Sequence, residues 1–391
     1  MPTDISARRT GSEPEILQAG ERRSARVESL RAIAALSVLV AHAWMYAHGF
    51  GASTYVPFLH RIVASGALGV QLFFALSGYL IFRPFARRDF GGGGPINLRS
   101  YAFNRALRIL PLYWFAVVVL LVLTQHGGSS NQWWRFGLFA ETFSRTTAQT
   151  VDGPMWSVVV EIHFYILLPL IAWVLAGLSQ GRRWMAGALL IGAGAISVLF
   201  QYNMPHPAIV WTYSLPSTFY GFVPGMLLAL LQIGWEERPP AWLRGPLASR
   251  DAWIAASILV WVAAAWYLFT VPPLTAAAAF LTVGAVVLPL RHEQMVRVLD
   301  SRPLALLGVA SYSLYMWHVP IMAQLTKLTI FQHDFALLVL VALPAALLTA
   351  AISYFVVERP ALRQRRRWST SAAPKLAEAM PDVAPEAAAA S

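Results

Sequence analysis

The segment ESLRAIAALSVLVAHAW, residues 28–44, is apolar except for a few side chains that can carry charge or protons. In a helix, Arg31 and His42 would be separated by about 16 Å along the axis. An ionisable side chain at membrane depth normally faces a cavity or a partner. A neutral imidazole can take a proton from a hydroxyl as that oxygen attacks a carbonyl, so His42 is a candidate general base.

A carboxylate lies inside a second apolar segment, MWSVVVEIHFYILLPL. Glu161 would lie about 9 Å along the helix from its start at Met155, and we expect it to fix the tautomer of His42 as the second catalytic residue. His163 points to a different face of the helix. His318 lies about 21 Å from the start of LALLGVASYSLYMWHVPI and reaches a similar depth. For each residue alone, a structural hydrogen bond between helices is the alternative.

Two arginines stand at i, i+3 spacing in YAFNRALRILPLYW. Arg105 and Arg108 would share a helix face, where two guanidinium groups can hold phosphates through bidentate hydrogen bonds. The alternative is that they are ordinary basic residues at the cytoplasmic ends of membrane spans.

Metal, thiol and nucleic-acid chemistry find little support in the sequence. His42 and His48 do not share a helix face well, and no His-x3-His pattern or acidic cluster completes a coordination shell, so we predict no metal site. The chain contains no cysteine, which excludes disulfides and thiolate nucleophiles. The net charge of +11 comes mainly from arginines in polar loops, and no nucleic-acid-binding module is visible.

These candidate residues must be positioned by membrane helices. The chain has 391 residues, of which 57% are hydrophobic and 13% charged, and this composition is typical of an integral membrane protein. We predict an all-α fold with about ten spans, since each apolar window can cross about 30 Å of hydrocarbon as a helix. The predicted spans are residues 31–48, 62–82, 109–125, 155–178, 184–200, 213–234, 252–270, 274–290, 304–326 and 335–357.

The distribution of arginine predicts the orientation of the chain. Most basic residues precede the first span or follow the even-numbered ones, so both termini are expected in the cytoplasm. Residues 1–24 are polar and basic, and residues 363–391 are rich in alanine and proline, so we expect both segments to be disordered. Residues 25–362 then form one transmembrane domain.

Six motifs, in this order, resemble acyltransferase family 3, whose members are bacterial multi-span enzymes that O-acylate carbohydrates, antibiotics and other acceptors. The resemblance covers about residues 24–362. Its motifs are ESLRAIAALSVLVAH, GVQLFFALSGYLI, RALRILPLYW, WSVVVEIHFY, SYSLYMWHVP and VERP.

The resemblance implies a multi-pass protein of the bacterial plasma membrane that binds acyl-coenzyme A, with acetyl as the expected acyl group. It implies a carbohydrate or another small molecule as the acceptor, with His42 as the catalytic histidine. The residues matching donor-binding or acidic motif positions are Arg31, Arg105, Arg108, Glu161 and Glu358. We expect Glu358 to form an ion pair beside Arg359 and Pro360 that ends the last helix at the donor entrance.

Several alternatives remain open from the sequence. A transporter or flippase would also use many spans and a polar interior, and an accessory protein could bind the donor without chemistry. Ser77 and Ser157 are alternative acyl carriers, although membrane serines more often bond to a helix backbone. Tyr315, His318 and Trp156 are candidate donors to an oxyanion. The sequence does not identify the acceptor, the acyl chain length or the oligomeric state.

Overall fold

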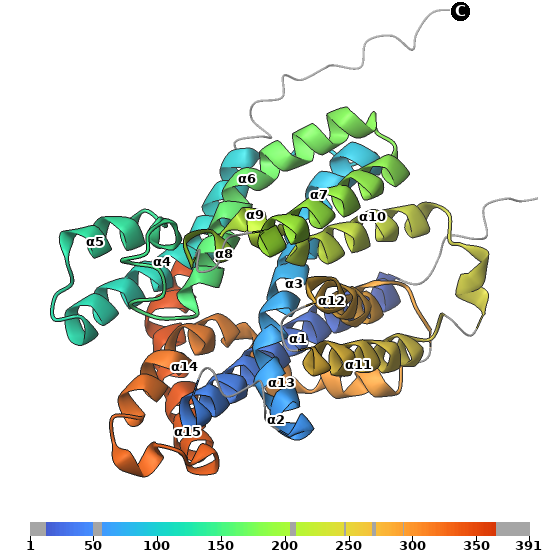
Figure 1. The fold of residues 1–391 in the computed structure, drawn as a ribbon. Helices are drawn as coiled ribbons and strands as arrows, with labels where there is room; N and C mark the ends of the chain where they lie inside the picture. The colour runs from blue at the N-terminus through green and yellow to red at the C-terminus, as the bar shows by residue number, and fades with distance from the viewer. Residues whose placement is uncertain are drawn as a thin grey trace, which may run out of the picture.

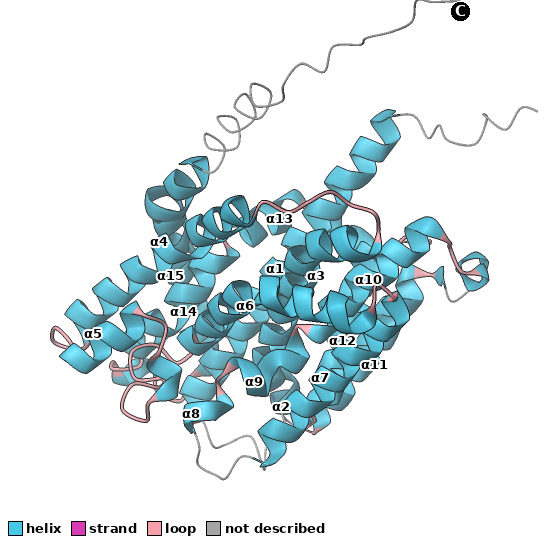
Figure 2. Ribbon diagram, turned by 90° about the horizontal axis from the view of Figure 1, so that it is seen from above, coloured by secondary structure: helices cyan, strands magenta, loops and turns pink. Residues whose placement is uncertain are grey.

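The computed structural model is a bundle of helices (Figures 1 and 2). It describes residues 13–49, 57–203, 209–245, 248–267, 271–291 and 293–364, and helices are the only regular elements in these ranges. The helices are α1 (Glu13–His48), α2 (Phe58–Ala64), α3 (Gly69–Phe90), α4 (Leu98–Thr124), α5 (Ser130–Gly137), α6 (Met155–Ser179), α7 (Arg183–Asn203), α8 (Ile209–Thr212), α9 (Leu215–Thr218), α10 (Val223–Glu237), α11 (Arg250–Trp266), α12 (Pro272–Val287), α13 (Arg302–Val309), α14 (Ser311–Leu325) and α15 (Phe335–Ser353).

The number of membrane crossings is only partly fixed by these helices. Among the described residues, six helices are long and apolar enough to cross a bilayer. The count rises to eight if each of two bent pairs is one span, namely Leu215–Gly221 with Val223–Glu237, bent by 44°, and α13 with α14, bent by 71°. Helix α12 is apolar but has only 16 residues. The all-α membrane fold is confirmed, whereas ten crossings and cytoplasmic termini stay predictions.

The ends of the domain differ from the expected boundaries. Residues 13–24 were predicted to be disordered, but they form the first turns of α1. The final helical segment was predicted to stop near Glu358, but it continues as a π-helical segment, Tyr354–Glu358, and then to Gln364. A π segment accommodates Pro360, which has no N–H to continue the regular ladder. The rest of the predicted disordered segments, residues 1–12 and 365–391, lies outside the described residues.

Helix α3 is the central element of the bundle and packs against α1, α6, α10 and α12 (Figure 1). Two glycines bring its backbone into contact with the neighbouring segment. A Cβ added at Gly78 would meet the backbone carbonyl of Phe222, and one added at Gly225 would meet that of Ala75. The close approach of α3 to α10 therefore depends on these two glycines.

The beginning of α1 is held to a distant segment by a buried arginine. Arg26 is only 4% exposed. It donates two hydrogen bonds to Asp300, at 2.7 and 2.8 Å, and one to Glu293 at 2.9 Å. Ser29 adds a hydrogen bond of 2.7 Å to the backbone carbonyl of Leu299. These contacts fix the helix that carries Arg31 and His42.

Candidate active site

His42 and His318 form a pair at the contact between α1 and α14. The Nε2 atom of His318 lies 3.3 Å from Nδ1 of His42, and the two ring centroids are 5.1 Å apart. His318 is almost fully buried, whereas His42 is partly accessible from a cavity. The prediction that both histidines reach a similar depth is thus supported by a direct contact.

Backbone carbonyls define the protonation pattern of this pair. Nδ1 of His42 lies 2.9 Å from the carbonyl oxygen of Val38, and Nδ1 of His318 lies 2.6 Å from that of Tyr315. Because a carbonyl oxygen can only accept, each Nδ1 carries the hydrogen when the rings are neutral. Nε2 of His318 is then an acceptor for His42, and Nε2 of His42 keeps its lone pair. Histidine and backbone, not a carboxylate, set this tautomer.

The accessible side of His42 lines a cavity of about 750 Å³. Helices α1, α3, α6, α12 and α14 all contribute to its wall. Trp156 and Tyr315, two of the predicted oxyanion donors, also line the cavity. The hydroxyl of Tyr315 is already bonded to Ser157 at 2.7 Å and to the carbonyl of Pro154 at 3.2 Å. Ser157 therefore has a structural partner, as expected for most membrane serines.

Glu161 belongs to a different polar group from His42. Its Oε1 atom accepts hydrogen bonds from the hydroxyls of Ser77 and Tyr165. The side chains of Ser157, Glu161 and Tyr165 follow each other at i, i+4 spacing, so they form one polar stripe on α6. The structure does not bring Glu161 into hydrogen-bond contact with His42. The prediction that Glu161 fixes the tautomer of His42 by direct contact is therefore wrong.

Arg105, on the neighbouring helix α4, extends the polar stripe of α6. Its guanidinium carbon lies 5.9 Å from the centroid of the Tyr165 ring, and its Nε atom is buried without a hydrogen-bond partner. Arg31 is similar, since its Nε is also buried without a hydrogen-bond partner and its nearest carboxylate, that of Glu28, is 3.9 Å away. Buried guanidinium nitrogens without partners suit an anionic ligand, because an unmade hydrogen bond from a charged group is costly.

Arg108 is engaged within the protein. It forms an ion pair with Glu358, whose carboxylate also accepts a hydrogen bond of 3.0 Å from Ser313. The predicted ion pair of Glu358 exists, but its partner is Arg108 and not the adjacent Arg359, which lies over the Phe355 ring at 5.3 Å. The charge of Arg31 also acts on Glu358, so three of the predicted donor-site residues share one neighbourhood.

Two buried carboxyl groups outside the spans were missed by the sequence reasoning. Glu141 is 1% exposed and Asp152 is 4% exposed, and no carboxyl oxygen of either has a hydrogen-bond partner. Burial raises the pKa of Glu141 to about 8 and raises the pKa of Asp152 well above its usual range. Their positions in the polar segment between α5 and α6 gave no sequence signal of burial.

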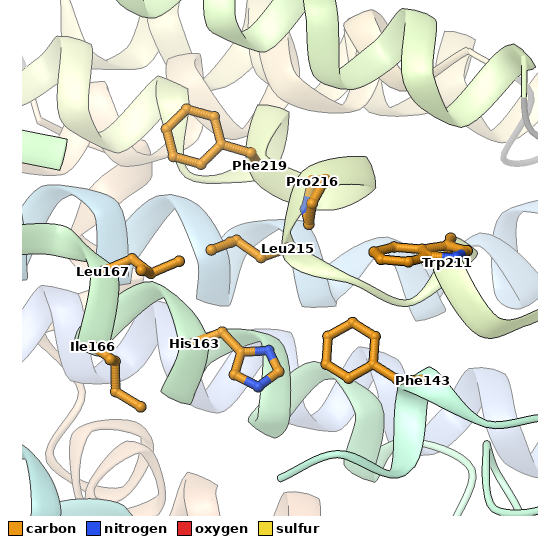
Figure 3. A pocket seen from close by; sticks show the side chains of 8 residues that line it. All are labelled: Phe143, His163, Ile166, Leu167, Trp211, Leu215, Pro216 and Phe219. Carbon is orange, nitrogen blue, oxygen red and sulfur yellow. The ribbon is translucent and has the colours of Figure 1, made fainter. Parts of the chain in front are cut away.

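His163, which the sequence placed on another helix face, lines a separate hollow of about 560 Å³ (Figure 3). Its ring stacks on Phe143 with the centroids 5.6 Å apart. Leu167, Trp211 and Leu215 are among the other residues around this hollow, which is almost entirely apolar. A lipid-facing role suits this composition, and His163 is not part of the histidine pair.

The fold and site together define a helical multi-pass membrane protein in which buried arginines and a histidine pair are joined by a polar stripe. The chain belongs to the family whose model is described as an acyltransferase domain, which matches residues 24–358. The family and its O-acetyltransferase relatives support an enzyme that transfers acyl groups other than amino-acyl groups. The resemblance seen in the sequence motifs is confirmed.

Three relatives illustrate the family. YrhL of Bacillus subtilis (strain 168), provisionally named a peptidoglycan O-acetyltransferase, is 25% identical over 85% of this chain and 54% of its own length. The exopolysaccharide production protein ExoZ of Rhizobium meliloti (strain 1021) is 29% identical over 77% of this chain and 91% of its own. A provisionally named O-acetyltransferase of Staphylococcus aureus (strain COL) is 22% identical over 85% and 56%.

The chain thus spans about half the length of YrhL and of the staphylococcal protein. No solved structure matches it significantly.

Proposed function

We propose that this protein is a membrane O-acyltransferase that moves an acetyl or other short acyl group from acyl-coenzyme A to a hydroxyl of a carbohydrate or similar acceptor. The observation that carries the proposal is the arrangement of His42, with Nδ1 fixed on the Val38 carbonyl and the ring lining a cavity that carries several polar side chains. The names of the relatives, two of them O-acetyltransferases and one an exopolysaccharide production protein, support the class of reaction and acceptor.

His42 is the general base in this proposal. Nε2 of His42 removes the proton of the acceptor hydroxyl as the oxygen attacks the thioester carbonyl. The new C–O ester bond forms, the C–S bond breaks, and the proton passes from His42 to the departing thiolate. His318 accepts from Nδ1 of His42 and so favours the imidazolium that exists between the two proton transfers.

The coenzyme A phosphates would be bound by an arginine group, Arg31, Arg105 and Arg108, at the opposite end of the polar stripe from His42. Arg31 and Arg105 each have a buried nitrogen without a hydrogen-bond partner, which fits a phosphate oxygen. Arg108 is held by Glu358, so we propose that Glu358 orients this arginine at the donor site. Glu161 would complete the polar lining between the donor site and the histidine pair.

The proposal includes the orientation predicted from the sequence. Ten spans with both termini in the cytoplasm of a bacterium would place the arginine group at the cytoplasmic face of the plasma membrane, where acyl-coenzyme A is made. The cavity beside His42 would then open toward the opposite face.

Thiol release is the direct test. Because the chain contains no cysteine, the protein itself adds no thiol to the measured signal. Purified protein in lipid nanodiscs would be mixed with acetyl-coenzyme A and acceptor glycosides, and free thiol would be measured with a chromogenic disulfide. We expect His42→Ala to lower acceptor-dependent thiol release by at least about 100-fold, since general-base catalysis contributes that much or more. His163→Ala is the matched control and should keep near-normal turnover.

The same assay separates the competing classes. A transporter or flippase would move its substrate without releasing thiol, and an accessory protein would bind the donor without turnover. Near-normal kinetics in His42→Ala would remove this histidine from the mechanism. Loss of activity in His163→Ala to the same extent would show that the assay reports membrane-helix packing instead of chemistry.

A further inference from the structure

The wall of the cavity beside His42 carries several polar side chains but, among the described residues that line it, contains no aspartate, glutamate, lysine or arginine. Its polar groups are amides, hydroxyls and the imidazole itself. An anionic ligand would lose its hydration in this cavity without gaining a counter-charge, which is a large cost. An uncharged ligand with several hydrogen-bonding groups would meet no such cost.

Two glutamines on this wall have acceptor atoms that no hydrogen bond satisfies. Oε1 of Gln71 and Oε1 of Gln201 are both buried without a partner. Gln71 is 7% exposed, and its amide nitrogen donates a hydrogen bond of 3.1 Å to the hydroxyl of Tyr220. This bond fixes the orientation of the amide, so the oxygen of Gln71 is the atom left without a hydrogen-bond partner.

Buried acceptors of this kind are rare in native proteins and need a hydrogen donor. Gln71 is near the start of α3 and Gln201 near the end of α7, so the two side chains line one cavity from different elements. A ligand that satisfies both must carry at least two O–H or N–H donors. A polyhydroxylated ring carries them at fixed positions.

Aromatic side chains complete the match to such a ring. Trp156 and Tyr213 form an adjacent pair on the wall, with ring centroids 4.8 Å apart and planes at 41°. The negative face of an aromatic ring attracts the slightly positive C–H groups of a sugar. The volume of about 750 Å³ lies in the range of about 300–1,000 Å³ that is usual for small-molecule sites.

We propose that Gln71, oriented by Tyr220, and Gln201 form the acceptor subsite, and that it selects uncharged polyhydroxylated units over anionic ones. The inference rests on the proposed function only for the role of the bound molecule as acceptor. Binding itself needs no acyl donor and can be measured without turnover.

The test compares two probes that differ in one group. Methyl α-glucopyranoside and the corresponding methyl glucuronide have the same ring, with CH2OH in one and a carboxylate in the other. Binding to the full-length protein in nanodiscs, with no acyl donor present, would be followed by saturation-transfer NMR. We expect the neutral glycoside to bind at least about tenfold more tightly, which is a difference of about 1.4 kcal/mol in binding free energy.

Substitutions then locate the subsite. Gln71→Leu keeps the approximate size of the side chain but removes the acceptor, so it should weaken binding of the neutral glycoside about tenfold. Gln201→Lys introduces a positive charge and should move the preference toward the glucuronide. Gln332→Leu, outside the cavity, is the matched control and should bind as the unmodified protein does. Gel filtration and thermal unfolding would identify any variant that does not fold.

Each outcome decides the proposal. Equal binding of the two glycosides, no binding of either, or unchanged binding in a folded Gln71→Leu variant would overturn it, and buried water would then satisfy the glutamines. Selective binding of the neutral glycoside that responds to both glutamine substitutions supports it. If that binding occurs while acetyl-coenzyme A yields no thiol, the subsite stands and the proposed acyl transfer fails.

Discussion

We predict that breaking the buried ion pair between Arg108 and Glu358 lowers the stability of the protein by a large amount. Glu358 is 1% exposed, the Arg108 side chain is 17% exposed, and Ser313 supplies the other hydrogen bond to the carboxylate. Glu358→Gln keeps the shape and the Ser313 contact but leaves a guanidinium with no counter-charge. Removing one partner of a buried pair costs about 3–5 kcal/mol, and the partial exposure of Arg108 places the expected loss near the lower value.

Reversible unfolding by SDS in mixed micelles would measure this loss. Arg108→Met should cost a similar amount, whereas the double variant Arg108→Met with Glu358→Gln should cost less than either single change, because no charge is then left unpaired. Glu236→Gln breaks the exposed pair with Arg87, in which the side chains are 42% and 47% exposed, and should change stability by less than about 1 kcal/mol.

The reasoning is refuted if Glu358→Gln costs no more than Glu236→Gln. It is also refuted if the effects of the two single changes simply add in the double variant.

Three further predictions concern other parts of the molecule. Because burial raises the pKa of Glu141 from 4.5 to about 8, its neutral form favours folding, and stability should fall as pH rises from about 4.5 to about 8 and then level off; Glu141→Gln should flatten this fall in unfolding measured at several pH values. Gly225→Ala would place a methyl group against a backbone carbonyl of α3 and should destabilise by about 1–3 kcal/mol or more, whereas Gly177→Ala, with open space around it, should be neutral or mildly stabilising in the same assay. His318→Phe removes one of the two acceptors of Nδ1 of His42, the other being the Val38 carbonyl, and should lower kcat about tenfold with little change in the acceptor KM; equal changes in both constants would contradict a positioning role.

Hydrophobic runs predicted the helical elements well, because a chain in lipid must satisfy its backbone within each helix. Over the described residues, all ten predicted spans fall on helices or bent pairs of helices. The number of crossings was harder to predict, since α12 is short and α13 and α14 meet at 71°. Apolar composition does not record where a helix bends.

The site was partly predictable because ionisable residues in apolar segments stand out. His42, His318 and Glu161 were selected in this way, and the two histidines do meet. The partners were not predictable, because depth along a helix does not give rotation about its axis. The i, i+4 stripe of Ser157, Glu161 and Tyr165 would have shown that Glu161 faces a hydroxyl-rich neighbour. Gln71 was missed because the selection considered ionisable residues in apolar segments, and a neutral amide is not ionisable.

The glycine contacts between α3 and α10 limit how this bundle can move. Backbones that touch at Gly78 and Gly225 interlock, so neither helix can slide along the other without separating the pair. α3 also carries Ser77, the hydroxyl partner of Glu161, and Gln71 of the cavity wall. Rocking of one half of the bundle against the other, on which alternating-access carriers depend, would have to break the close contact between α3 and α10. We therefore expect any opening that admits a molecule to involve helices other than the α3–α10 pair.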